Sequence, residues 1–171
     1  EEEEDGERVM DYYLKKTFYK TASLMAHSCQ SAALLGDYST EIISASYLYG
    51  KHVGMAFQLI DDVLDYEGSL STTGKPPMSD LRSGVATAPL LFASQQFPEE
   101  VGELMKRGFE REEDVERAVE LVRRSGGLER TKDLAQVHAE VGVGAIMGCL
   151  EESEYRDALV KLAFKVVDRT K

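Results

Sequence analysis

Apolar residues recur at helical spacing from one end of the chain to the other, and this pattern constrains the fold more than any other feature. No stretch alternates apolar and polar residues over the length of a strand between turn signals. The sequence therefore predicts an all-α fold. Its 171 residues, 43% of them hydrophobic, are enough for a buried core and exclude a disordered chain. The expected helices cover residues 7–35, 40–67, 88–97, 99–108, 112–125, 128–150 and 154–169.

The ends and the net charge limit the classes of partner. Acidic residues occupy positions 1–5, and we expect residues 1–8 to form a disordered acidic tail ahead of a single helical domain over 9–171. The net charge of −11 argues against nucleic acid as a partner, because phosphate contacts need clustered Lys and Arg. No uncharged apolar run reaches the roughly 18 residues that a transmembrane helix needs. Because the chain begins with Glu, we expect a processed form or a fragment.

The most informative segment, residues 54–65, reads Gly-Met-Ala-Phe-Gln-Leu-Ile-Asp-Asp-Val-Leu-Asp. At about 100° per residue, four of its positions share one narrow stripe of a helix. These are Gly54, Gln58, Asp61 and Asp65, and Asp62 lies beside them. The other positions are apolar around nearly the whole circumference, which is typical of a buried helix. We therefore expect the polar stripe to face a cavity.

Carboxylates on a partly buried stripe carry a desolvation cost of several kcal/mol per ion unless a counter-charge is present. Raised pKa values, basic partners or a bound cation would each reduce that cost. Asp61 and Asp65, one turn apart with Asp62 beside them, are hard oxygen ligands that suit Mg²⁺ with several retained waters. Mg²⁺ in such sites usually bridges to substrate phosphates, so an acidic chain can hold an anionic substrate. The alternative is an ordinary solvated acidic face.

The same segment resembles the second aspartate-rich motif of the trans-polyprenyl diphosphate synthases. Other segments are similar to motifs of this family, in its order: Tyr13-Leu14, Lys20-Thr21-Ala22-Ser23-Leu24, Tyr49-Gly50, Gly74-Lys75-Pro76, Asp80-Leu81, and Gly84-Val85-Ala86-Thr87 followed by Pro89. The likeness runs from about Tyr13 to the C-terminus. The stretch from Asp80 to Pro98 is most similar to the long-chain branch, which makes the polyprenyl tail of ubiquinone.

The resemblance implies an isoprenoid-synthase-type helical bundle, of which this chain has about the C-terminal half. It also implies a Mg²⁺-dependent prenyltransferase that condenses isopentenyl diphosphate with an allylic diphosphate. The ubiquinone-branch likeness implies the mitochondrial matrix, with the cytoplasm as the expectation otherwise.

Three sets of site residues follow from the resemblance. Asp61 would hold metal, supported by Asp62 and Asp65, while Thr21 and Gln58 would point oxygen dipoles at the developing carbocation. Lys20 and Lys75 would contact the allylic diphosphate. The expected catalytic set is therefore Lys20, Thr21 and Gln58; the diphosphate set is Lys20 and Lys75; and the metal set is Asp61, Asp62 and Asp65.

The chain also departs from the family pattern. The family's first aspartate-rich motif and its Gly-Lys-x-x-Arg element are both missing, and Val85 stands where the family commonly has a lysine. These differences keep a second hypothesis open, a non-catalytic subunit or fragment that associates with a catalytic partner. In either case we expect an oligomer, formed with itself, with an N-terminal half or with a partner subunit. A class I terpene cyclase ranks third, since the Lys-Thr and Gly-Lys-Pro segments do not fit it.

Overall fold

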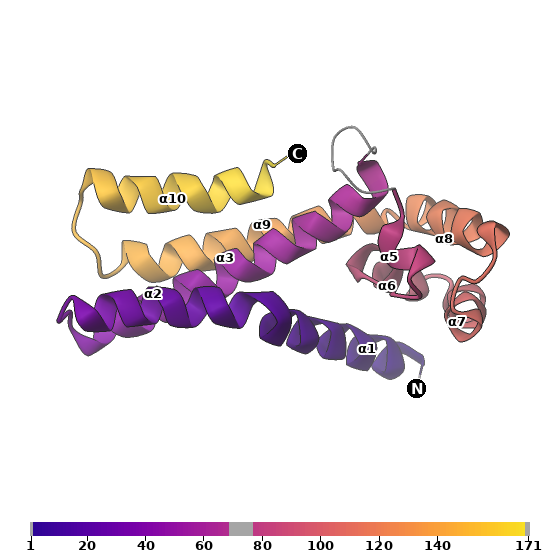
Figure 1. Ribbon diagram of the computed structural model, residues 1–171, viewed down its shortest axis with the longest axis horizontal. Helices are drawn as coiled ribbons and strands as arrows, with labels where there is room; N and C mark the ends of the chain where they lie inside the picture. The colour runs from indigo at the N-terminus through magenta and orange to yellow at the C-terminus, as the bar shows by residue number, and fades with distance from the viewer. Residues whose placement is uncertain (1, 69–76, 170–171) are drawn as a thin grey trace. The chain divides into compact units, whose positions relative to one another are not determined.

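The regular elements of the chain are helices throughout the part that the structure describes (Figure 1). The structure is a computed structural model that describes residues 2–68 and 77–169, and no strand occurs within these two ranges. The helices are α1 (Glu2–Thr17), η1 (Phe18–Ala22), α2 (Ser23–Leu35), α3 (Thr40–Glu67), α5 (Ser79–Arg82), α6 (Ala88–Ser94), α7 (Pro98–Arg107), α8 (Glu112–Arg124), α9 (Gly127–Met147) and α10 (Glu154–Val167). The all-α prediction is confirmed.

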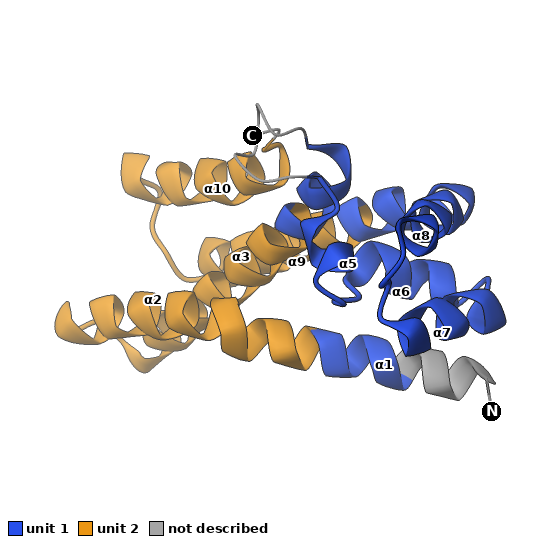
Figure 2. Cartoon of the chain, turned by 45° about the vertical axis from the view of Figure 1, so that its right-hand side comes forward, with its two compact units in different colours: residues 1–13, 61–132, 170–171 blue, residues 14–60, 133–169 orange. Residues whose placement is uncertain are grey.

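Two compact units divide the chain (Figure 2). Unit 1 comprises residues 1–13, 61–132 and 170–171, and unit 2 comprises residues 14–60 and 133–169. Helices α1, α3 and α9 each continue from one unit into the other. Each unit has its own buried side chains.

Unit 1 contains a core made by the short helices α6, α7 and α8 together with the end of α3. Its fully buried side chains include Leu90, Val101, Leu104 and Leu121. Pro89 lies in the first turn of α6, and Pro98 begins α7. Proline is tolerated at these positions because the first amides of a helix have no partner within it. The two prolines therefore set where α6 and α7 begin, as expected from the sequence.

Unit 2 is organised around the first 21 residues of α3, residues 40–60, which contact η1, α2, α9 and α10. On α9, Gly142 lies against the His52 side chain and the Tyr49 backbone. On α10, the Leu159 carbonyl oxygen accepts a hydrogen bond of 2.7 Å from the Tyr49 hydroxyl. The contact with α2 is made through small residues, with Gly50 of α3 against the backbone of Met25 and Ala26. Many of the buried residues in this unit are alanines, which allow helix axes to approach closely.

The expected single helix over residues 7–35 is interrupted by the π-helical turn η1. α1 begins at Glu2, earlier than expected, and the division into an acidic tail and a domain near residue 8 stays a prediction. The expected loop over residues 68–80 lies mostly outside the described residues, and its last two residues begin the short helix α5. The other helices begin and end close to their expected positions.

Candidate functional site

The Lys20-Thr21 pair lies within the π-helical turn, between α1 and α2. A π-turn inserts an extra residue into a helix, which rotates the side chains that follow it, and such turns occur frequently at functional sites. Lys20 is exposed and Thr21 is half-buried. The local backbone therefore presents an exposed cation next to a hydroxyl on a partly buried surface.

The structure brings Thr21 and Gln58 together, 37 positions apart in the chain. The Thr21 hydroxyl donates a hydrogen bond of 2.9 Å to Oε1 of Gln58, whose side chain is buried. Two of the three residues that sequence reasoning placed in the catalytic set therefore form a pair within unit 2. The third, Lys20, is the neighbour of Thr21 in the same turn.

Glycines on α3 make this pairing possible by letting the helix approach η1 and α2. A Cβ atom added at Gly54 would lie 2.7 Å from the Ala22 Cα atom, and one at Gly50 would lie 2.5 Å from the Met25 carbonyl oxygen. Gly50, Gly54 and Gln58 follow each other at intervals of four residues, so they share one face of the helix. The prediction that the polar stripe faces a cavity is therefore wrong at Gly54, because the backbone of η1 occupies that space.

Asp62 is a buried carboxylate with partners from two other helices of unit 1. The Tyr13 hydroxyl of α1 donates a hydrogen bond to Oδ2 of Asp62, and the Ala88 amide at the start of α6 donates to the same oxygen at 3.5 Å. Asp62 is only 2% exposed. Its surroundings are those of a structural carboxylate, and the metal-binding role expected from the sequence stays a prediction.

Asp65, half-buried, organises the start of α5. Its Oδ1 accepts hydrogen bonds from the Ser79 amide (3.1 Å) and the Ser79 hydroxyl (2.7 Å), and its Oδ2 accepts one from the Asp80 amide (3.1 Å). The residue before the helix, Met78, supplies no side-chain cap. Asp65 therefore caps α5 from a distant part of the chain, as an N-terminal carboxylate stabilises unpaired amides.

Tyr66 follows Asp65 and adds to the polar surroundings at this end of α3. Burial raises the pKa of its phenol strongly, and the negative charges of Asp65, Asp62 and Asp80 raise it further. The phenol is therefore neutral throughout the physiological pH range.

Asp61 differs from the other two carboxylates of the motif because its side chain is exposed. It is the one expected metal ligand that lies on the surface of unit 1. Among the described residues, no three or more His, Cys, Asp or Glu side chains are grouped so that they could hold a metal ion. Lys75, the second expected diphosphate contact, lies outside the described residues.

Sequence reasoning missed three features of the site: the π-turn, the capping of α5 by Asp65 and the bond from Tyr13 to Asp62. The family pattern includes Tyr13 but predicts no partner for it. The two hydrogen-bonding features join residues 14 to 49 positions apart, so no local pattern could have revealed them. Helical periodicity also carries no signal for a single π-turn.

A helical bundle with a Lys-Thr turn and an aspartate-rich helix is the architecture of a polyprenyl synthetase. Residues 1–122 match the polyprenyl synthetase family, and the chain belongs to it. It is 50% identical over 166 residues to a protein named probable hexaprenyl pyrophosphate synthase, mitochondrial, from Neurospora crassa, covering 97% of this chain and 36% of that protein.

Solved structures agree with this assignment. The apo form of an Arabidopsis medium/long-chain length prenyl pyrophosphate synthase matches with a TM-score of 0.85 and 40% identity, covering 95% of this chain and 56% of that one. A Caulobacter crescentus polyprenyl synthase complexed with calcium and isoprenyl diphosphate matches with a TM-score of 0.84 and 36% identity, covering 93% and 49%. This confirms the expected isoprenoid-synthase fold.

The chain spans only 36% of the Neurospora relative and about half of each of these two solved chains. Within the described residues, no helix combines the length and apolar character needed to cross a membrane.

Proposed function

We propose that this chain forms part of a long-chain trans-polyprenyl diphosphate synthase and binds the diphosphate of the allylic substrate. In the proposed reaction of the whole enzyme, the allylic C–O bond breaks, the alkene of isopentenyl diphosphate attacks the resulting cation, and a proton is lost. The observation that carries the proposal is the hydrogen bond between Thr21 and Gln58, because it joins two motifs that were assigned to the reaction separately. The family membership gives these motifs their context.

The Thr21–Gln58 pair is suited to stabilising positive charge without reacting with it. Since the Thr21 hydrogen is directed to Gln58, the lone pairs of its oxygen remain available to face a cationic carbon. Amide and hydroxyl oxygens are neutral and are alkylated less readily than a basic nitrogen. Groups that are fixed in place before the reaction stabilise developing charge most effectively, and this bond fixes both side chains.

The carboxylates of the aspartate-rich helix suit a Mg²⁺ ion that binds together with the substrate. They do not suit a site in which the protein alone supplies every ligand. Mg²⁺ usually binds one or two protein carboxylates together with waters and substrate phosphates. Asp61, exposed on α3, would be the direct ligand, with Asp65 one turn further along. When bound, the ion supplies Lewis acidity to the leaving diphosphate. Asp62, buried against Tyr13, would support the helix and would not contact the metal.

Binding of inorganic pyrophosphate in the presence of Mg²⁺, measured by titration calorimetry, tests the proposal. We expect Mg²⁺-dependent binding that Asp61→Asn weakens at least tenfold, because the substitution removes a metal-binding charge while preserving shape. The control is Asp133→Asn, an exposed aspartate on α9, which removes the same charge elsewhere and should leave affinity unchanged. Equal affinity for the Asp61→Asn variant and the unmodified chain would refute the assignment of the site.

A non-catalytic subunit is the second candidate. Val85, 37% exposed, provides no charge at a position where the family commonly has a lysine, and the chain spans only part of its relatives. Turnover of labelled isopentenyl diphosphate with an allylic diphosphate, with and without an added partner chain, separates the two candidates.

The mitochondrial location in the Neurospora protein's name supports a mitochondrial, and by extension matrix, location here.

A further inference from the structure

Tyr13 and Asp62 make a buried contact between α1 and α3 in unit 1, to which neither the reaction nor the metal assigns a role. Tyr13 is buried, and its hydroxyl donates to Oδ2 of Asp62 across 49 positions of the chain. The Ala88 amide donates to the same carboxylate oxygen. One carboxylate therefore holds the end of α3 to both α1 and the start of α6.

A buried carboxylate is stable only where donors replace the water it has lost. Here the donors come from two separate helices, so the position of Asp62 is set from more than one side. Because successive residues of a helix lie about 100° apart around its axis, holding α3 at Asp62 sets the side of the helix from which Asp61 projects. The contacts of the buried residue therefore hold the backbone that carries the exposed one.

Resting on the function proposed above, we propose that Tyr13 is a positioning residue that acts through Asp62 to hold Asp61 in the orientation in which it binds Mg²⁺. Partners behind a metal ligand commonly set its geometry, and their removal typically costs about 10-fold to 100-fold in metal affinity. Tyr13 would act indirectly, since it donates a hydrogen bond to Asp62, the neighbour of the proposed ligand Asp61, and not to Asp61 itself.

The test is the substitution Tyr13→Phe, which removes the hydroxyl and keeps the buried ring. In the calorimetric assay with Mg²⁺ and inorganic pyrophosphate, we expect the Mg²⁺ concentration at half-saturation to rise about tenfold or more. The matched control is Tyr12→Phe, which removes a hydroxyl from the preceding tyrosine, 71% exposed, and should change nothing. Circular dichroism at the assay temperature shows whether each variant is folded.

A double-variant cycle separates positioning from a purely structural effect. If Tyr13 acts through Asp62, adding Tyr13→Phe to Asp62→Ala, which removes the acceptor of the Tyr13 hydroxyl, should weaken Mg²⁺-dependent binding little further. The inference is overturned if Tyr13→Phe lowers the melting temperature but leaves the half-saturating Mg²⁺ concentration unchanged, or if the two effects are additive. If the unmodified chain shows no Mg²⁺-dependent binding, the proposed function is overturned and this inference with it. If the unmodified chain and Tyr13→Phe both bind normally, only this inference is overturned.

Discussion

At the scale of single residues, His52 and His138 form a pair that responds to protons. Their Nδ1 atoms lie 2.9 Å apart in unit 2, one ring on α3 and the other on α9. A hydrogen bond between two Nδ1 atoms needs one donor and one acceptor, so the accepting nitrogen must be unprotonated. Burial, together with the nearby His52 and Lys51, lowers the pKa of His138 to about 4. Burial and Lys51 also lower the pKa of His52.

This pair predicts that the chain is less stable in mild acid. The pKa of each histidine is lower in the folded chain than in the unfolded one, so the unfolded chain binds more protons as the pH falls below about 6.5. The contribution of the neutral histidine pair to the free energy of unfolding is complete above that pH and decreases toward pH 4. Since His138 is only partly buried and solvent screens its charge, we expect a loss of about 1–2 kcal/mol in the free energy of unfolding between pH 7.5 and 5.

Urea denaturation of the unmodified chain and of His138→Gln at both pH values measures this effect. The variant should lose less stability on acidification, because the lowered pKa of His138 is removed, while that of His52, which burial and Lys51 cause, remains. Carboxylates also titrate in this range, and they contribute equally to both chains. A variant that loses as much stability as the unmodified chain would contradict the prediction.

At the scale of the elements, the sequence is sufficient to predict the bounds of helices that begin or end at a local signal such as Gly or Pro. α3 spans residues 40–67, as expected from the Gly36-Asp37 break before it and Gly68 after it, and α7 begins at Pro98. Features that depend on distant residues could not be predicted in this way. Asp65 has a spacing suited to a metal ligand, but its carboxylate caps α5. Gly54 lies on the expected polar stripe, but the stripe packs against another helix at that point.

The close approach of α3 to η1 predicts a strong dependence on the size of residue 54. Gly54→Ala places a methyl group 2.7 Å from the Ala22 Cα atom, so the helices must move apart. Overpacking of this kind costs about 1–3 kcal/mol, more than alanine gains over glycine in a helix. The separation should also disrupt the Thr21–Gln58 bond. Thermal unfolding followed by circular dichroism measures the loss.

The control for this substitution is Gly144→Ala in α9, also in unit 2. A Cβ atom there meets nothing within 4 Å, so helix propensity alone should stabilise the chain by up to about 1 kcal/mol. Opposite signs for the two substitutions are the expected result. A melting temperature that rises for Gly54→Ala would show that α3 and η1 are not closely packed.

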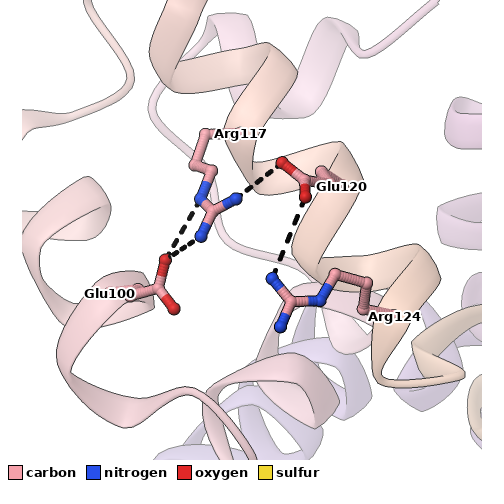
Figure 3. Close-up of polar contacts among 4 residues, drawn as sticks. All are labelled: Glu100, Arg117, Glu120 and Arg124. Carbon is pink, nitrogen blue, oxygen red and sulfur yellow. Dashed lines mark hydrogen bonds and ion pairs between the residues drawn. The ribbon is translucent and has the colours of Figure 1, made fainter.

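Helices α7 and α8 are linked on the surface of unit 1 by a small charge network (Figure 3). Arg117 donates to Glu100 on α7 and to Glu120 on its own helix, at 2.6 Å in the second case, and Arg124 lies 3.8 Å from Glu120. All four side chains are more than one-third exposed, so water and salt weaken their attraction. We therefore expect the network to contribute little to the free energy of unfolding.

Substituting Arg117 tests this interpretation. We expect Arg117→Gln to lower the melting temperature slightly in low salt, and the difference from the unmodified chain to disappear in concentrated sodium chloride, where charges are screened within a few ångströms. Arg123→Gln, which removes an equal charge from the same helix, is the control and should have a smaller effect. A large loss that persists at high salt would mean that the network contributes more than surface electrostatics.

At the scale of the whole molecule, α2 presents a surface that is unusual for an exposed helix. Its 13 residues contain no Asp, Glu, Lys or Arg, and Leu24, Leu34 and Leu35 are 74%, 64% and 88% exposed. Leu24 and Leu35 fall on one stripe of the helix, separated by the exposed Ser28 and Ser31. Single exposed leucines are common in proteins, but a charge-free stripe of this length marks a surface for association.

We therefore expect the chain to associate with a second copy of itself through α2. Light scattering coupled to size exclusion should give an apparent mass that exceeds 19.0 kDa and falls on dilution. The double variant Leu24→Glu/Leu35→Glu should run as a monomer without loss of melting temperature, because neither side chain contributes to the core. Leu162→Glu is the control: this leucine is 50% exposed, but it lies on α10 among charged residues and should not affect the mass. If the unmodified chain is a monomer at every concentration, or if the double variant associates as strongly as the unmodified chain, then α2 is not the surface through which copies of the chain meet.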